Sequence, residues 1–213
     1  MNVHSLKKVK EMNWKKTEKL NNESLKDSGK PLMKRLIYIS LPVMLITATL
    51  VIFLLELSGY PGTLDDTQLG FNAEIIKAYF TMMTSEDMAL FILGNLVDYA
   101  FMIAYGCLFY SSARYLSWDY QQGSLPLKVG KMMAVIGVLS AICDAIENIF
   151  LLSMTINPVG FPDWLAIAHS TFALVKFILM YLTVGWLILS FILNRIPSIS
   201  KRINGNITTD LVK

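Results

Sequence analysis

Charged residues are scarce in this sequence. Asp, Glu, Lys and Arg make up 16% of the 213 residues, whereas soluble domains carry about a quarter. Apolar residues make up 54% of the chain, and the mean hydropathy is positive, at +0.49. This balance argues against a soluble globular protein and favours a single domain within a membrane.

Cysteine is also rare. The chain contains two, Cys107 and Cys143, and both lie within apolar segments. No cysteines are matched in polar loops, so the sequence gives no sign of a disulfide framework. The chain also lacks C-x-x-C, H-E-x-x-H, Asp-rich phosphate and nucleophile-elbow motifs, which leaves the familiar thiol oxidoreductases and membrane proteases without support.

Long apolar runs are abundant. A helix needs about 20 mostly apolar residues to cross a hydrocarbon core of roughly 30 Å. Four segments meet this requirement, at residues 36–57, 88–113, 132–154 and 164–194. The first has no charge from Leu36 to Leu55 and therefore no polar face for a soluble bundle. The sequence predicts an all-α integral membrane protein whose domain, residues 36–194, is a bundle of four transmembrane helices.

The distribution of Lys and Arg predicts the orientation of the bundle. Ten of them lie in the first 35 residues, and others lie at Arg114, Lys128 and Lys131 and in the C-terminal tail. The two remaining connections contain only Lys77. Because basic flanks stay on the cytoplasmic side, both termini are predicted to be inside, an N-in/C-in topology.

Residues 1–35 and 195–213 are therefore expected to be cytoplasmic tails. Leu6, Val9, Met12 and Leu20 form a thin apolar stripe among the lysines, which suits binding to anionic lipid. The composition favours a simpler interpretation, a disordered tail that only sets the topology. No apolar segment precedes the first span as it would in a signal peptide, so we expect that span to remain as an anchor.

The first outer connection, residues 58–87, contains helix signals. Asn72 is predicted to be the N-cap of a short amphipathic helix that includes Ile76 and Phe80. We expect this helix to lie at the outer interface as a partial lid. Ser85 is predicted to be the N-cap of the second span, with Glu86 and Asp87 in its first turn.

Ionisable residues interrupt the last three spans. Each costs about 2.5 to 3.5 kcal/mol in hydrocarbon on insertion scales, so each needs a partner or a polar cavity. They are Asp98 in the second span, Asp144 and Glu147 in the third, and His169 and Lys176 in the fourth. Such residues mark functional sites by default.

Helical spacing places most of this cluster on facing surfaces. Asp144, Glu147 and Asn148 are at positions i, i+3 and i+4 and share one face of the third span. His169 and Lys176 share a face of the fourth span, about two turns apart. We therefore expect these side chains to point together into the bundle.

Depth follows from a rise of 1.5 Å per residue. Counted from the outer ends of the spans, Asp98, Asp144 and Lys176 lie in one layer, roughly 15 to 18 Å below the outer surface. The other members of the cluster lie one or two turns nearer the outer loop. The sequence predicts a polar column that opens toward the outer side.

The charges of the cluster do not balance. Three acids face one Lys and one neutral His, so full ionisation leaves about two excess negative charges in a medium of low dielectric constant. Either some acids are protonated at neutral pH, or the site holds a cation, an amine or a metal. The alternative is structural, with Lys176 and Asp144 forming an interhelical ion pair that sets the packing.

Binding or transport of a small cationic or proton-coupled substrate is the function that the cluster favours most. Asp98, Asp144, Glu147, Asn148, His169 and Lys176 would form the binding site or proton relay. Four helices suffice for transport if the protein forms a homodimer or the substrate is small. The plasma membrane or inner membrane is the favoured location, and no nucleic-acid partner is expected.

Two other functions stay open at this point. A lipid-modifying enzyme would use Asp98, Asp144, Glu147 and His169 as ligands of a divalent metal, or a carboxylate and His169 as general base and acid. An accessory subunit or scaffold would use the polar layer only to specify assembly. The sequence names no cofactor.

The predicted topology can be tested by glycosylation. The chain has two acceptor patterns, Asn22-Glu23-Ser24 and Asn206-Ile207-Thr208, and both fall on the predicted cytoplasmic side. In cells with a glycosylating secretory pathway we expect neither to be modified, whereas an acceptor inserted into residues 58–87 is modified. A glycan on either native site, detected as a mobility shift, would overturn the topology.

Overall fold

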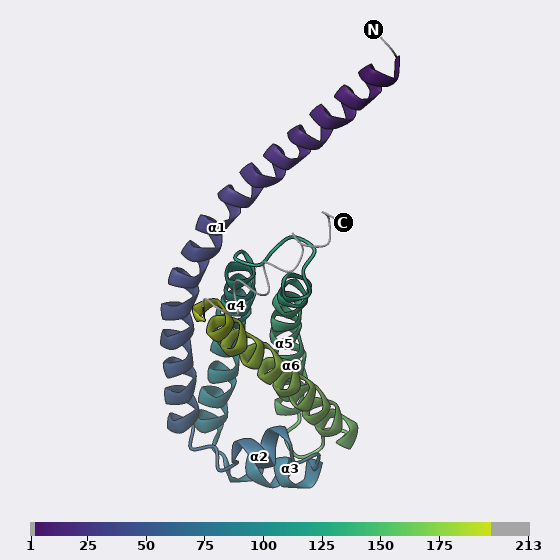
Figure 1. Cartoon of the computed structure of the whole chain (residues 1–213). Helices are drawn as coiled ribbons and strands as arrows, with labels where there is room; N and C mark the ends of the chain where they lie inside the picture. Colours follow the sequence, from purple (N-terminus) through teal and green to yellow (C-terminus); the bar gives the residue numbers. More distant parts are fainter. Residues whose placement is uncertain (1–2, 197–213) are drawn as a thin grey trace.

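Residues 3–196 fold into six helices. The computed structural model describes the backbone of residues 3–196 and the side chains of Trp14, residues 29–63 and residues 66–196. The elements are α1 (Val3–Leu57), α2 (Leu64–Gln68), α3 (Ala73–Met82), α4 (Ser85–Ser117), α5 (Leu125–Thr155) and α6 (Asp163–Arg195) (Figure 1). No strand occurs within residues 3–196.

Four of the helices are long and apolar enough to cross a membrane. They are residues Gly29–Leu57 of α1 and the whole of α4, α5 and α6, of 29 to 33 residues each. Each contains one of the four predicted segments, which confirms a helical protein with four candidate membrane spans. The chain is thus a multi-pass membrane protein by the length and composition of its helices.

The first helix is much longer than its apolar part. Residues from Val3 onward continue into the span without a break, although Pro31 and Pro42 lie inside the helix. The preferred interpretation of residues 1–35 as a disordered tail is therefore wrong for the backbone from Val3 onward. Figure 1 shows this N-terminal part of α1 extending well beyond the bundle. The side chains of the predicted lipid-binding stripe, and residues 197–213, lie outside the described part of the chain.

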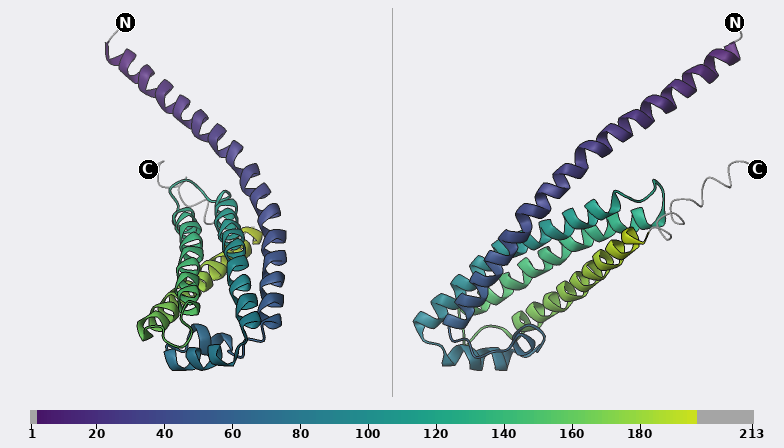
Figure 2. Two further views of the ribbon diagram at one scale, coloured as in Figure 1. Left: turned by 180° about the vertical axis from the view of Figure 1, so that it is seen from behind. Right: turned by 60° about the vertical axis from the view of Figure 1, so that its left-hand side comes forward.

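Small residues set the helix packing. Helix α1 packs against α4, α4 against α5, and α5 against α6 (Figure 2). A methyl group added at Gly106 of α4 would lie 2.9 Å from the Cβ atom of Ala141 on α5, so the two backbones approach closely only because this residue is glycine. Helix α1 is peripheral, since 6% of its most apolar window is buried, against 33% for α4 and α5.

Helices α2 and α3 lie across one end of the bundle (Figure 1). Asn72 caps α3 by accepting hydrogen bonds from the backbone of Glu74 and Ile75, at the position that the sequence indicates. Ile76 and Phe80 pack into an apolar core with residues of α4, α5 and α6. Helix α2 was not among the predicted elements. That this end faces outward stays a prediction.

The predicted N-cap of the second span is off by one residue. The N-cap of α4 is Thr84, not Ser85, because Thr84 and Asp87 form a reciprocal capping box. The backbone N–H of Thr84 donates to Asp87 Oδ2 at 2.9 Å, and the N–H of Asp87 donates to Thr84 Oγ1 at 3.2 Å. Asp87, three residues after Thr84, therefore selects Thr84 over the adjacent Ser85 as the N-cap.

This difference predicts unequal effects of two similar substitutions. Thr84→Ala removes the cap and should lower the free energy of unfolding by about 1 kcal/mol. Ser85→Ala should leave it nearly unchanged, because Ser85 is exposed and is the first residue inside the helix. Thermal unfolding of both purified variants tests the assignment, and a larger loss for Ser85→Ala would reverse it.

Candidate functional site

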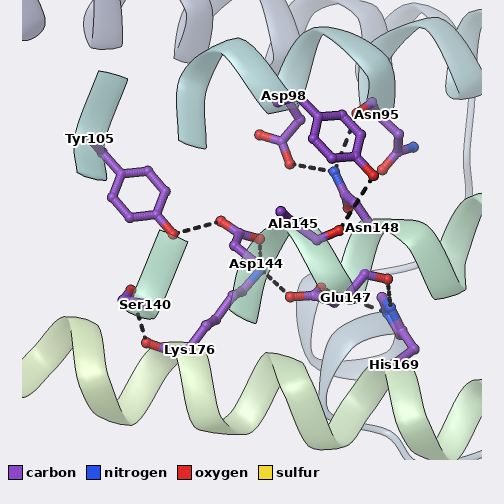
Figure 3. Close-up of polar contacts among 11 residues, drawn as sticks. Asn95, Asp98, Tyr105, Ser140, Asp144, Ala145, Glu147, Asn148, His169 and Lys176 are labelled. Carbon is purple, nitrogen blue, oxygen red and sulfur yellow. Dashed lines mark hydrogen bonds and ion pairs between the residues drawn. The ribbon is translucent and has the colours of Figure 1, made fainter. Parts of the chain in front are cut away.

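The ionisable residues of α4, α5 and α6 meet inside the bundle (Figure 3). Glu147 and His169 have no exposed surface, while Asp144 and Lys176 are 5% and 7% exposed. Asp98 is half-buried. The structure thus brings together all five of the ionisable side chains that the sequence indicates.

Lys176 lies between two carboxylates of α5. Its Nζ atom is 2.7 Å from Asp144 Oδ1 and 2.5 Å from Glu147 Oε2. The predicted pair of Lys176 with Asp144 is present, and the same ammonium group also pairs with Glu147. The two acids are one turn apart on one face of α5, so a single ammonium group reaches both.

Asp144 has a further partner that the sequence analysis missed. The hydroxyl of Tyr105 on α4 donates to Asp144 Oδ2 at 3.0 Å, and Tyr105 is 3% exposed. Tyr105 lies two helical turns after Asp98, on the same face of α4. A polar side chain two turns from an intramembrane acid on the same helix face is the sequence signal that would have identified Tyr105.

Asp98 is held by neutral groups. The Nδ2 atom of Asn148 donates to Asp98 Oδ2 at 2.9 Å and lies 3.3 Å from the backbone oxygen of Asn95. Among the described side chains, no Lys, Arg or His forms a salt bridge with Asp98. A negative charge on this carboxylate would therefore have hydrogen bonding but no direct ion pair.

The imidazole of His169 faces Glu147 on both sides of the ring. Its Nδ1 atom is 3.3 Å from the backbone oxygen of Glu147, and its Nε2 atom is 3.8 Å from Glu147 Oε1. Neither Nε2 nor Oε1 has a hydrogen-bond partner within the described part of the chain. A carbonyl oxygen only accepts, so a hydrogen bond from the neutral ring to the Glu147 backbone places the proton on Nδ1 and leaves Nε2 as an acceptor. Two acceptors then face each other, and a proton on either atom would join them.

The site is closed at the end where α2 and α3 lie. The backbone N–H of Phe71 donates to Ser170 Oγ on α6 at 3.2 Å, next to the fully buried His169. Phe71 has a φ of 51°, in the left-handed region that non-glycine residues seldom adopt. The predicted opening of the polar column is not present at the end that the sequence predicts to be the outer one, because the connection between α2 and α3 covers it.

Tyrosines hold this covering segment. Tyr60 Oη and Thr67 Oγ1 lie 3.0 Å apart, and the Tyr79 hydroxyl donates to Asp66 Oδ2 at 3.0 Å. Burial raises the pKa of Tyr60 to about 12, and the hydrogen bond to Asp66 raises the pKa of Tyr79. Both hydroxyls are therefore protonated at neutral pH and available for these contacts.

The arrangement gives no support for a metal centre. Within the described residues, no three His, Cys, Asp or Glu side chains are placed to hold one metal ion. The ammonium of Lys176 occupies the space between Asp144 and Glu147, where the two carboxylates would attract a metal ion most strongly. The hypothesis that Asp98, Asp144, Glu147 and His169 bind a divalent metal thus stays a prediction without geometric support.

Comparisons with protein-family models, curated proteins and solved structures found no match to this chain. The class that the fold and the site define is a helical multi-pass membrane protein with a closed cluster of ionisable residues in its bundle.

The bridging role of Lys176 can be tested by charge removal. Lys176→Met leaves two buried acids without their cation, and breaking a buried pair in this way costs about 3 to 5 kcal/mol. Combining it with Asp144→Asn and Glu147→Gln should recover most of that loss. Thermal unfolding of the purified variants in one detergent measures both effects.

A matched control is Lys77→Met, which removes an ion pair with Asp163 at the molecular surface, where Asp163 is 70% exposed. Such pairs contribute about 1 kcal/mol or less. If Lys176→Met unfolds at the wild-type temperature, or if the triple variant is no more stable than the single one, Lys176 does not hold the acids in the folded protein.

Proposed function

We propose that the buried cluster binds and exchanges a proton, and that the protein uses this site for binding or transport of a small cationic or proton-coupled substrate. The observation that supports this function most directly is that a closed site holds three carboxyl groups and one ammonium group, which pairs with Asp144 and Glu147 and leaves Asp98 with neutral partners. Intramembrane carboxylates of this kind commonly form proton relays.

The charge balance favours proton uptake. If Asp98, Asp144 and Glu147 are all ionised and Lys176 is charged, the site carries three negative charges and one positive charge, a net charge of −2. The Tyr105 hydroxyl and the Asn148 amide stabilise carboxylates by hydrogen bonding but do not offset their charge. One or two protons, or a small cation, would remove the imbalance.

Glu147 is the residue at which a proton best fits. A proton on its Oε1 atom would be donated to Nε2 of His169 after a small closure of the 3.8 Å gap. Neutral Glu147 would then attract Lys176 less strongly, and the ammonium would pair with Asp144 alone. The position of Lys176 would thus depend on whether Glu147 carries a proton, which couples proton binding to the contact between α5 and α6.

A substrate larger than a proton or a small ion requires a second conformation. Glu147 and His169 are entirely buried, and the segment around Phe71 covers them. Alternating exposure would therefore involve displacement of α2 and α3 from α6. Four spans also suit a homodimer, and the proposed location is the plasma membrane or inner membrane.

The first experiment is thermal stability across pH and with added cations, for wild type, Asp144→Asn and Glu147→Gln. If the folded state holds extra protons, wild-type stability should fall as pH rises. Glu147→Gln, which imitates the protonated acid, should melt higher than wild type at alkaline pH by about 2 to 4 °C per kcal/mol gained. It should also lose most of the pH response.

The control variant is Glu86→Gln, which neutralises an exposed acid in the first turn of α4 and should keep the wild-type response. Proton flux into proteoliposomes should be lost in Glu147→Gln and retained in Glu86→Gln. If wild type shows no response to pH or cations and both buried-acid variants melt lower, the cluster is a packing device and the scaffold hypothesis holds. Turnover of lipid without flux would indicate an enzyme instead.

A further inference from the structure

An apolar groove runs along the outside of α4, between α1 and α5. Its volume is about 420 Å³, and its lining includes Leu36 of α1, Tyr99 and Tyr110 of α4, and Val138 and Ala145 of α5. Figure 2 shows these three helices side by side, with α4 in the middle. The groove is separate from the ionisable cluster, because none of the five charged side chains lines it.

The shape of the groove suits an extended chain. From Tyr99 to Tyr110 it follows twelve residues of α4, whose ends are roughly 16 Å apart at 1.5 Å per residue. Its floor is shallow because Gly106 and Ala141, which both line it, let α4 and α5 approach closely. An elongated apolar groove along the candidate membrane spans α4 and α5 matches a hydrocarbon chain.

Basic residues continue the lining of the groove at one end. Arg114 lies one turn after Tyr110 on α4, and Lys131 lies two turns before Val138 on α5, so each shares the face that lines the groove. The two helices are antiparallel neighbours, and Ser117 meets Gly130 at this end. Arg114 and Lys131 are thus at nearly the same height along the bundle. Arg114 lies over the Trp118 ring at 5.7 Å, and Lys131 is exposed.

The surroundings of this end are strongly positive. Among the side chains that the structure describes, the only acid there is Asp119, which pairs with Lys30 at 2.6 Å. The other charged residues at this end of the helices are Lys34, Arg35, Arg114, Lys128, Lys131 and Arg195. Basic pockets between membrane helices on the cytoplasmic side bind anionic lipid headgroups.

We propose that this groove binds one acyl chain of an anionic phospholipid, whose phosphate lies between Arg114 and Lys131. An apolar groove alone would accept any lipid chain or another helix. The two basic residues that extend its lining select a lipid with a negatively charged headgroup. The inference requires only the four-span fold and does not depend on the function of the buried cluster.

Native mass spectrometry of the full-length protein tests the headgroup. We expect wild type to retain phosphatidylglycerol in preference to phosphatidylcholine of the same chain length. Each basic residue near a membrane surface strengthens the binding of anionic lipid by about fivefold. The double variant Arg114→Gln/Lys131→Gln should therefore bind phosphatidylglycerol about 25-fold more weakly and leave phosphatidylcholine unchanged. Arg195→Gln, which removes a positive charge from the same end on α6, is the matched control.

A second variant tests the groove itself. Cys107→Phe fills the groove from an exposed lining position, and it should weaken the binding of both lipids. Ile178→Phe places the same side chain at an exposed position of α6 outside the groove and should weaken neither. All variants are compared at matched thermal stability.

Two outcomes would overturn the proposal. One is an unchanged preference for phosphatidylglycerol in the Arg114→Gln/Lys131→Gln protein. The other is that Cys107→Phe breaks up a dimer without changing lipid binding, which would assign the groove to a second copy of the chain.

Discussion

A charge inside hydrocarbon is stable only beside a partner, and this constraint governs how α4, α5 and α6 meet. The Lys176 ammonium provides the partner for two carboxylates at once, since Asp144 and Glu147 are one turn apart on α5. Its stem crosses from α6 to α5, and Tyr105 connects the same acid to α4. Three helices are thus joined through one carboxylate, Asp144, at the centre of the bundle.

The same constraint leaves an imbalance that packing alone does not explain. A purely structural ion pair needs one acid for one base, yet Glu147 and Asp98 are present as well. The Oε1 atom of Glu147 faces Nε2 of His169 across 3.8 Å with no hydrogen bond between these two atoms, so this contact is incomplete without a proton or a small shift. Incomplete contacts of buried polar groups are costly, and they are kept most often where they serve a function.

The covering segment gives this cluster its closed environment. Helices α2 and α3 join the bundle through an apolar core around Ile76 and Phe80 and through the bond from Phe71 to Ser170. Because the segment lies directly above His169, any movement of it changes the solvation of the imidazole and of Glu147. Access to the site and its charge state are therefore physically linked, which is the property that proton-coupled proteins need.

The sequence by itself determined the four spans, the shared face of Asp144, Glu147 and Asn148, and the cap of α3 at Asn72. These features depend on apolar length and on spacing along one helix, which are local properties of the chain. Tertiary structure alone decided that Lys176 reaches Glu147 as well as Asp144, that Tyr105 and Asn148 bind the acids, and that the cluster is closed at the end where α2 and α3 lie. The N-cap of α4 at Thr84 depends on a local contact that spacing alone did not identify, the reciprocal hydrogen bonds between Thr84 and Asp87. Contacts between helices depend on their axial offset and on side-chain conformation, and the packing of small residues such as Gly106 sets that offset.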